Sequence, residues 1–143
     1  MVHHDARRWI DHVLAGSPVA RGIGLRFTTI EPDRIVATLP FGPDRVTLND
    51  LVHGGVIATL IDIAGAAASA SGIGDGVAGG ATATMSIAYL APARGCDLTA
   101  EAVVIQRGRI QTVTDVSVCD PCGRAIAKGI VTSRLFLRKK AAE

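Results

Sequence analysis

The stretch Gly54–Ser71, GGVIATLIDIAGAAASAS, constrains the fold of this chain more than any other. Its side chains are small and almost wholly apolar, and Val, Ile, Ala and Leu occupy every side of the helical wheel. A helix that is apolar all round is a buried helix, so we expect a core helix of roughly 27 Å. A single carboxylate, Asp62, interrupts it near the middle. Because a lone buried carboxylate is costly unless something pairs with it or uses it, we look for function there.

The composition is that of one globular domain. The 143 residues are 48% hydrophobic and 20% charged, with a net charge of +2, and no basic stripe is interleaved with aromatic residues. We therefore expect a single domain over residues 1–143 that does not bind nucleic acid. The N-terminus, MVHHDARRWIDHV, carries charges where a signal peptide needs an apolar core, so we expect a cytoplasmic protein. Glycine, serine, Thr59 and Asp62 within residues 54–71 favour a core helix over a membrane span.

The segments before the long helix predict a short helix and a hairpin. Apolar residues recur at helical spacing over residues 5–14, and Gly16-Ser17-Pro18 stops the pattern, which gives an N-terminal helix within residues 1–17. Residues 19–24 read as a connector. Residues 25–30 and Arg34–Leu39 are rich in β-branched side chains and are separated by a turn, so they predict a β-hairpin.

The segments after the long helix predict strands. The glycine-rich residues 72–80 end the helix, and strand candidates follow at residues 81–90, 97–106, 110–119 and 125–137, before a charged tail at 138–143. Each connection has hairpin length, which indicates a mainly antiparallel sheet. The fold class is therefore α+β: a long central helix wrapped by a sheet of five to six strands, with a short N-terminal helix.

The three cysteines do not form a disulfide framework, because their number is odd. Cys119 and Cys122 have CxxC spacing, yet there is no second pair to complete a zinc site. We read them as a strand end and a turn, with a redox or metal role as the alternative. We expect no metal and no organic cofactor.

The entrance of the long helix shares a face with Asp62. Gly55 and Asp62 are seven residues apart, about 20° from alignment, and Gly54 lies about 80° away. The first N–H groups of a helix are free and carry the positive end of its dipole, so they suit an oxyanion or a polarised carbonyl. Asp62 is about 10 Å deeper along the axis, which favours a site between subunits. In the alternative, His53 fixes the turn before the helix, and Asp62 bonds a buried backbone group or an Arg across an interface.

These residues resemble a known family. Residues 52–62, VHGGVIATLID, are similar to the HGG-x(6)-D signature of hotdog-fold acyl-CoA thioesterases, in particular the phenylacetic-acid-degradation (PaaI-like) group. The likeness continues through Thr82 to the YLAP sequence at 89–92, the DLTAEA and GR sequences at 97–102 and 108–109, and GRAIAKG at 123–129.

The resemblance implies a fold, an assembly and a reaction. It implies homodimers with a continuous sheet, often paired into tetramers, with active sites between subunits and acyl-CoA as the substrate. Asp62 matches the catalytic carboxylate, acting as nucleophile or as general base on water. The Gly54 N–H matches the group that polarises the thioester carbonyl, and His53 matches a supporting residue. Thr82 falls where related enzymes place a Ser or Thr that orients the attacking water from the other subunit.

The substrate-binding residues are less clearly marked. Many members of the family carry Asn or Gln six residues before the histidine; here that position is Thr47, and Asn49 lies two residues later. Either Asn49 takes the task, or it falls to Thr47 or water. Gly55 lets a ligand approach the backbone, and Arg107 and Arg109, with the basic tail, are candidates for the phosphates of coenzyme A. The expected function is hydrolysis of small aryl or medium-chain acyl-CoA thioesters; a non-catalytic acyl-CoA-binding protein and a hotdog dehydratase or hydratase are the alternatives.

Overall fold

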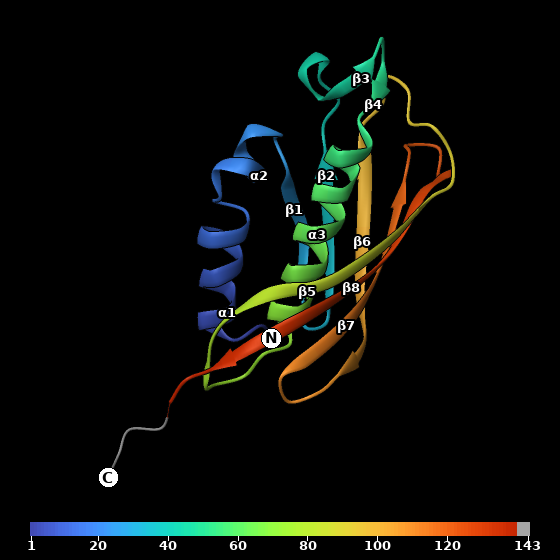
Figure 1. Ribbon diagram of the computed structural model, residues 1–143. Coiled ribbons are helices and arrows are strands. Elements are labelled where there is room, and N and C mark those ends of the chain that lie inside the picture. Colours follow the sequence, from blue (N-terminus) through green and yellow to red (C-terminus); the bar gives the residue numbers. More distant parts are fainter. Residues whose placement is uncertain (140–143) are drawn as a thin grey trace.

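The long apolar stretch forms a single helix, α3 (Gly54–Ser71), around which the rest of the chain is arranged (Figure 1). The computed structural model describes residues 1–139. Of the predicted charged tail, residues 140–143 lie outside the described part. The α+β prediction is confirmed, with a six-stranded sheet curving around one central helix.

The sheet is antiparallel throughout and has the strand order β1-β2-β6-β7-β8-β5. The predicted hairpin and strands are present with small shifts at their ends. The bounds are β1 Arg26–Glu31, β2 Arg34–Leu39, β5 Val77–Tyr89, β6 Leu98–Arg107, β7 Gln111–Cys119 and β8 Ala125–Leu137. A separate two-stranded ribbon, β3 (Val46–Leu48) and β4 (Leu51–Val52), precedes α3.

Alternate residues along the central strands of the sheet point toward α3 and help to form the hydrophobic core. On β2, Ile35, Ala37 and Leu39 are buried toward α3, while the residues between them are half-buried. The facing side chains on β6 and β7 are mostly small, so α3 can lie close to the sheet. At Gly65, where α3 packs against β8, there is no room for a side chain on the helix, since a Cβ added there would lie 2.8 Å from the Cβ of Val131.

The N-terminal helix is confirmed: helical structure runs from His4 to Leu14, against the predicted residues 5–14. α1 (His4–Arg8) runs directly into a π-helical segment, η1 (Trp9–Leu14), and both lie beside α3 (Figure 1). The connector predicted at residues 19–24 instead begins with a helix, α2 (Pro18–Gly22). Ser17 caps α2 by accepting a hydrogen bond from the Ala20 N–H at 3.2 Å, and Pro18 occupies its first position. A Ser-Pro pair is a helix start as well as a stop, which explains the error.

Strand β5 departs from the expected order. Hairpin-length connections suggested that it pairs with the next strand along the chain, but it pairs with β8 at the far edge of the sheet. The segment after it crosses the entrance of α3, where the Val52 N–H donates to the Ala93 carbonyl at 2.9 Å. β5 also starts at Val77, inside the glycine-rich segment predicted to be a connection.

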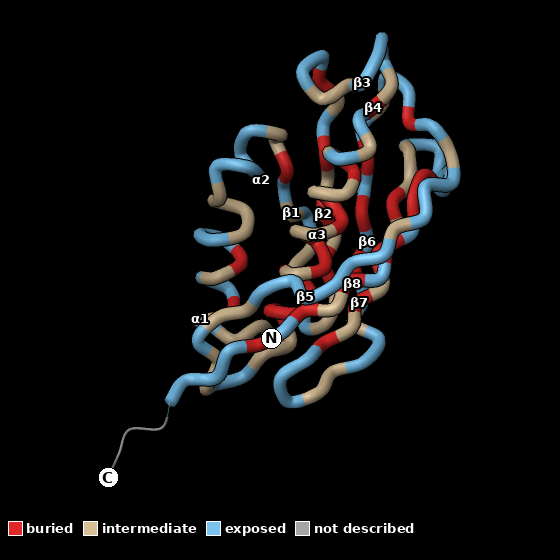
Figure 2. The backbone as a smooth tube through the Cα atoms, in the orientation of Figure 1, coloured by how far each residue is buried: buried red, intermediate tan, exposed pale blue. Residues whose placement is uncertain are grey.

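The prediction that α3 is buried on all sides is only partly right. Among residues 1–139 it is the one helix long and apolar enough to cross a membrane, and its buried side packs against the strands of the sheet. One flank is half-buried or exposed, and it contains Gly55, Ala58, Thr59, Asp62, Ile63 and Ala66. Strand β5, beside it, is pale along most of its length in Figure 2, and its outer edge pairs with no strand of the described chain.

Candidate active site

His53 and Gly55 together build the start of α3. The His53 Nδ1 accepts a hydrogen bond from the Gly55 N–H at 2.8 Å and so caps the helix. The imidazole lies over Gly55, because a Cβ added there would be 2.8 Å from the His53 Cε1. The interpretation that His53 fixes the turn is therefore confirmed. Glycine suits position 55 because the imidazole ring, in its capping position, leaves no room for a side chain there.

Gly54 leaves its backbone N–H available. This N–H donates to no acceptor in the described part of the chain, as expected for the first residue of a helix. The Gly54 carbonyl, by contrast, accepts a hydrogen bond from the Tyr89 hydroxyl at 2.7 Å. The Tyr89 ring flanks the glycine, since a Cβ added at Gly54 would lie 3.5 Å from it. Sequence reasoning used Tyr89 only as part of a motif and did not predict this contact.

Asp62 is held by a residue from β5. The Thr82 hydroxyl donates to the Asp62 Oδ1 at 2.5 Å, within the same chain. Asp62 is half-buried on the open flank of α3, and Thr82 is exposed. Thr82 and Asp62 therefore meet within one chain, and the expectation that Thr82 orients the attacking water from the other subunit stays a prediction. The hydroxyl leaves the second carboxylate oxygen of Asp62 for other partners.

A single chain does not bring the two ends of this site together. Gly54 and Asp62 are eight residues apart on one straight helix, which separates their backbones by about 12 Å. A thioester carbonyl spans a small fraction of that distance. One chain thus presents a free N–H at one place and an oriented carboxylate at another.

A hollow beside Gly54 is lined by Thr47 and not by Asn49. Its other lining residues include Ile57, Tyr89 and Pro92. Asn49 lies in the tight turn between β3 and β4 with a φ of 53°, a conformation that Asn tolerates better than most residues. The residue that occupies the family's amide position, Thr47, is the one placed near the helix entrance.

Arg107 and Arg109 lie at the other end of α3 from Gly54. The Arg107 guanidinium donates to the Asp33 Oδ1 at 2.7 and 3.0 Å and to the Ser69 carbonyl at 2.8 Å. It thereby neutralises the negative end of the helix dipole. Arg109 is exposed in the connection between β6 and β7. The structure brings neither residue to the Gly54 entrance of its own chain.

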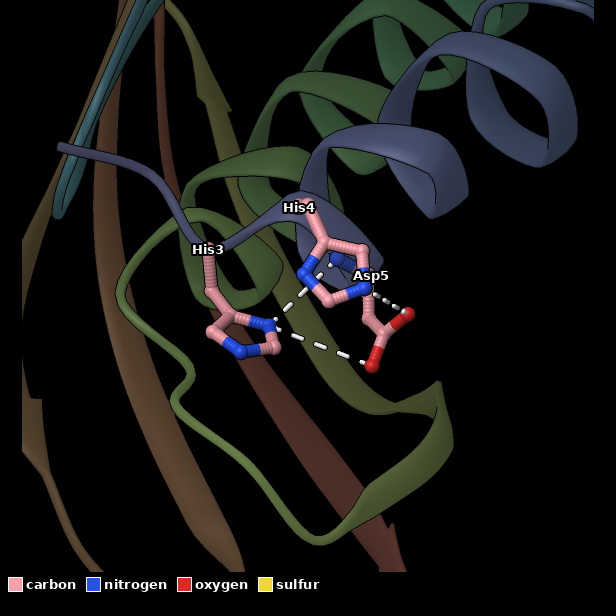
Figure 3. A group of neighbouring side chains, drawn as sticks. All are labelled: His3, His4 and Asp5. Atoms are coloured by element: carbon pink, nitrogen blue, oxygen red, sulfur yellow. Dashed lines mark hydrogen bonds and ion pairs between the residues drawn. The ribbon is translucent and has the colours of Figure 1, made fainter.

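Two groups of metal-ligand residue types have structural explanations. His3, His4 and Asp5 gather at the start of α1 (Figure 3), where the His3 Nδ1 accepts from the Asp5 N–H at 3.4 Å as a helix cap. At the other group, Asp120 organises the CxxC turn by accepting from the Cys122 and Arg124 N–H groups at 3.0 and 2.9 Å. All three cysteines are free thiols, and burial raises the pKa of the Cys96 thiol.

A cavity of about 360 Å³ lies next to the Asp62–Thr82 pair, between η1 and the C-terminal half of α3. Ala66, one helical turn after Asp62, and Ala81, next to Thr82, both line it. Its walls are mostly apolar, and Trp9 and Leu135 line it from opposite ends of the chain. A cavity of this size lies toward the lower end of small-molecule sites, at roughly 300–1,000 Å³.

Comparison with known proteins identifies the family. Residues 49–127, which include α3 and the sequence up to the start of β8, match the model of the thioesterase superfamily. The chain therefore belongs to the thioesterase superfamily, and its fold is the hotdog fold.

Curated relatives carry esterase names. The chain is 45% identical over 78 residues to a protein of Halobacterium salinarum named "putative esterase", covering 54% of this chain and 51% of the relative. It thus spans about half the length of that protein. A "putative esterase" of Saccharolobus solfataricus is 28% identical over 123 residues, covering 86% of this chain and 81% of the relative.

Solved structures extend the likeness to nearly the whole chain. The E. coli PaaI protein from the phenylacetic acid degradation operon superposes with a TM-score of 0.84 at 22% identity, covering 95% of this chain and 96% of that one. At that identity it shows the fold alone. A Streptococcus mutans protein solved with acetyl CoA bound has a TM-score of 0.72 and 25% identity, covering 81% of this chain and 91% of that one.

Proposed function

We propose that the protein hydrolyses acyl-CoA thioesters to a free acid and coenzyme A. The observation that carries this proposal is the Asp62 carboxylate, which Thr82 orients at 2.5 Å on the open flank of a helix whose first N–H is free. The superfamily and the esterase names of the relatives support it. The acetyl CoA bound by a structural relative supports coenzyme A as part of the substrate.

In this proposal the Gly54 N–H polarises the thioester carbonyl, and Asp62 acts as general base or as nucleophile. In the general-base form, Asp62 takes a proton from water while the water oxygen bonds to the acyl carbon. The carbon–sulfur bond then breaks, and the proton passes to the leaving thiolate. In the nucleophilic form, an Asp62 oxygen bonds to the acyl carbon while the carbon–sulfur bond breaks and coenzyme A leaves as the thiolate. Water then hydrolyses the mixed anhydride to the free acid and the Asp62 carboxylate, and the proton released goes to the thiolate. Both forms need the negative charge on the former carbonyl oxygen to be stabilised, which a free helix N–H does.

The proposed active unit contains two copies of the chain. The separation of about 12 Å along α3 keeps Gly54 and Asp62 of one copy from acting on the same carbonyl. A second copy that runs antiparallel against the open flank of α3 supplies the missing group, so that a homodimer has two sites. The exposed edge of β5 is suited to pairing with the same strand of that copy. We propose a dimer or a dimer of dimers, and a cytoplasmic location that agrees with three free thiols.

Thiol release from a panel of aryl- and alkyl-CoA thioesters tests the reaction. We expect Asp62→Asn to lower kcat by about 100-fold or more, because proton transfer by a positioned carboxylate contributes at least that factor. Asp75→Asn, which changes an exposed carboxylate after α3, serves as the control and should match wild type. Binding of acyl-CoA without thiol release would favour the non-catalytic binding protein, and near wild-type turnover by Asp62→Asn would refute the role of Asp62.

Mixed oligomers test the site between copies. Gly54→Pro removes the N–H while keeping the helix start, because proline suits the first helical position and His53 already has the extended backbone that precedes proline. Each variant alone should lose most of its thioesterase activity. A mixed dimer of Gly54→Pro with Asp62→Asn should regain activity, since one of its two sites then has both groups intact. If mixed dimers purified through two different tags stay inactive, the two groups act within one copy.

A further inference from the structure

Two buried hydroxyls line the cavity beside Asp62. Ser69, on α3, is 1% exposed, and Ser133, on β8, is 4% exposed. Neither Oγ has a hydrogen-bond partner in the part of the chain that the structure describes. Buried hydroxyls are nearly always paired, so two unpaired ones on one cavity need an explanation.

One serine lies beside the Asp62–Thr82 pair, and the other lies about two helical turns away from it. Ser133 pairs across the sheet with Thr82, the residue that binds Asp62. Ser69 lies seven residues after Asp62, on nearly the same side of α3. The cavity thus begins at Ala66, one helical turn past Asp62, and continues toward Trp9 and Leu14 of η1.

Most of the cavity wall would accept an alkyl or aryl group of any kind. Ala66, Ala70, Ile73, Val77 and Leu135 supply apolar surface. Of the lining residues that carry or can carry charge, Asp5 and Arg138 are paired with each other at 3.4 Å, and Arg8 and His12 are exposed at the rim. The serine hydroxyls are the neutral polar groups of this wall that are both buried and unpaired. A rotation about one side-chain bond lets each act as donor or acceptor.

We propose that Ser69 and Ser133 are specificity-determining residues that select acyl groups with a hydrogen-bonding substituent, such as a terminal hydroxyl, over unsubstituted acyl groups of the same length. The inference rests on the proposed thioester hydrolysis and adds the substrate class. An apolar acyl group would leave both hydroxyls buried and unpaired, whereas a substituent that reaches them satisfies them. A site whose polar groups are left unpaired discriminates against the ligand that lacks the matching group.

Matched pairs of substrates test the inference. Straight-chain acyl-CoA thioesters of four to eight carbons are compared with their terminally hydroxylated counterparts by thiol release, as the ratio of kcat/KM values. We expect wild type to prefer the hydroxylated member at one chain length at least. Ser69→Ala and Ser133→Ala should each reduce that ratio roughly three- to tenfold, the range for one buried hydrogen bond. Their Tm values should not fall, because the hydroxyls have no partner to lose.

Thr114 provides a matched control. Its hydroxyl is also buried and has no partner among the described residues, but Thr114 does not line the cavity. Thr114→Val should therefore leave the preference unchanged. A wild type without preference at any chain length, or serine variants that keep the full preference, would overturn the inference.

The failure of hydrolysis and the failure of selection are separable. If no thioester releases thiol, the proposed function fails, and calorimetric Kd values of the same substrate pairs on wild type then test selection alone. If wild type does hydrolyse the substrates, the Kd values are measured on the Asp62→Asn variant instead, and we expect it to bind the hydroxylated member of a pair more tightly than the unsubstituted one. Equal Kd values for both members of every pair would reject the role of the two serines in either case.

Discussion

Asp62 depends on Thr82 for its orientation, because the Thr82 hydroxyl fixes one carboxylate oxygen at 2.5 Å. We expect Thr82→Val to lower kcat roughly 10- to 100-fold with KM little changed, since a hydrogen bond to a charged group is worth about 1.5–3 kcal/mol. Steady-state thiol-release kinetics measure both constants.

Thr84→Val is the matched control for this substitution. Thr84 is also an exposed threonine on β5, but it pairs opposite Thr132 after the bulge and makes no side-chain hydrogen bond in residues 1–139. It should behave as wild type. An equal loss in both variants would assign the effect to the strand and not to the carboxylate.

The sequence predicts which residues belong to the candidate site better than it predicts the hydrogen bonds between them. Asp62, Gly54 and His53 stand out because they interrupt or begin one apolar helix. The bonds from Thr82 to Asp62 and from Tyr89 to Gly54 join residues 20 and 35 positions apart. Such contacts depend on which strand lies beside the helix, and local patterns carry no information about that. Asn49 is the opposite case, because the sequence suggested a contact that its position does not support. Its amide could serve the thioester, but the residue occupies a turn with positive φ.

Helix α3 packs tightly against β8 at Gly65. Gly65→Ala places a methyl group 2.8 Å from the Val131 Cβ and Cγ2 atoms, in a fully buried position. We expect this overpacking to lower the free energy of unfolding by about 1–3 kcal/mol, measured by urea denaturation.

Gly22→Ala is the control for that substitution. Nothing lies within 4 Å of a Cβ added at Gly22, the last residue of α2. Its stability should be unchanged or higher by up to about 1 kcal/mol. Equal stability of Gly65→Ala and wild type would mean that α3 shifts freely on the sheet.

Arg107 links three elements, because it binds Asp33 between β1 and β2 and the Ser69 carbonyl near the end of α3 from its place on β6. We expect Arg107→Met to lower the free energy of unfolding by about 1–2 kcal/mol. Arg109→Met, two residues away and exposed, should leave stability unchanged. A higher KM for acyl-CoA in Arg107→Met with unchanged stability would instead support the phosphate-binding prediction.

The sequence predicts well the helices and strands that have a strong hydrophobic periodicity, but it does not predict the order of the strands in the sheet. The alternation on β2 and the apolar run of α3 identify both elements, because each pattern reflects burial of one face. The place of β5 at the sheet edge follows from a segment that crosses the helix entrance and bonds to β4, which a connection length does not reveal. α2 was missed because Ser17-Pro18 serves both to end one helix and to begin the next.

For the whole molecule, the open flank of α3 and the edge of β5 bear on its assembly. We expect a dimer or tetramer by sedimentation velocity, and a fall in specific activity on dilution through the concentration range in which the assembly dissociates. Constant specific activity in a species shown to be monomeric would contradict a site formed by two copies.

The cavity beside Asp62 is walled by both ends of the described chain. Residues of α1 and η1 line one side, and Arg138, after β8, reaches Asp5 at 3.4 Å. A tag or fused domain attached ahead of α1 would therefore lie a few residues from the cavity wall. The choice of fusion site is thus a variable of any substrate survey, and untagged protein is the reference against which tagged preparations should be compared.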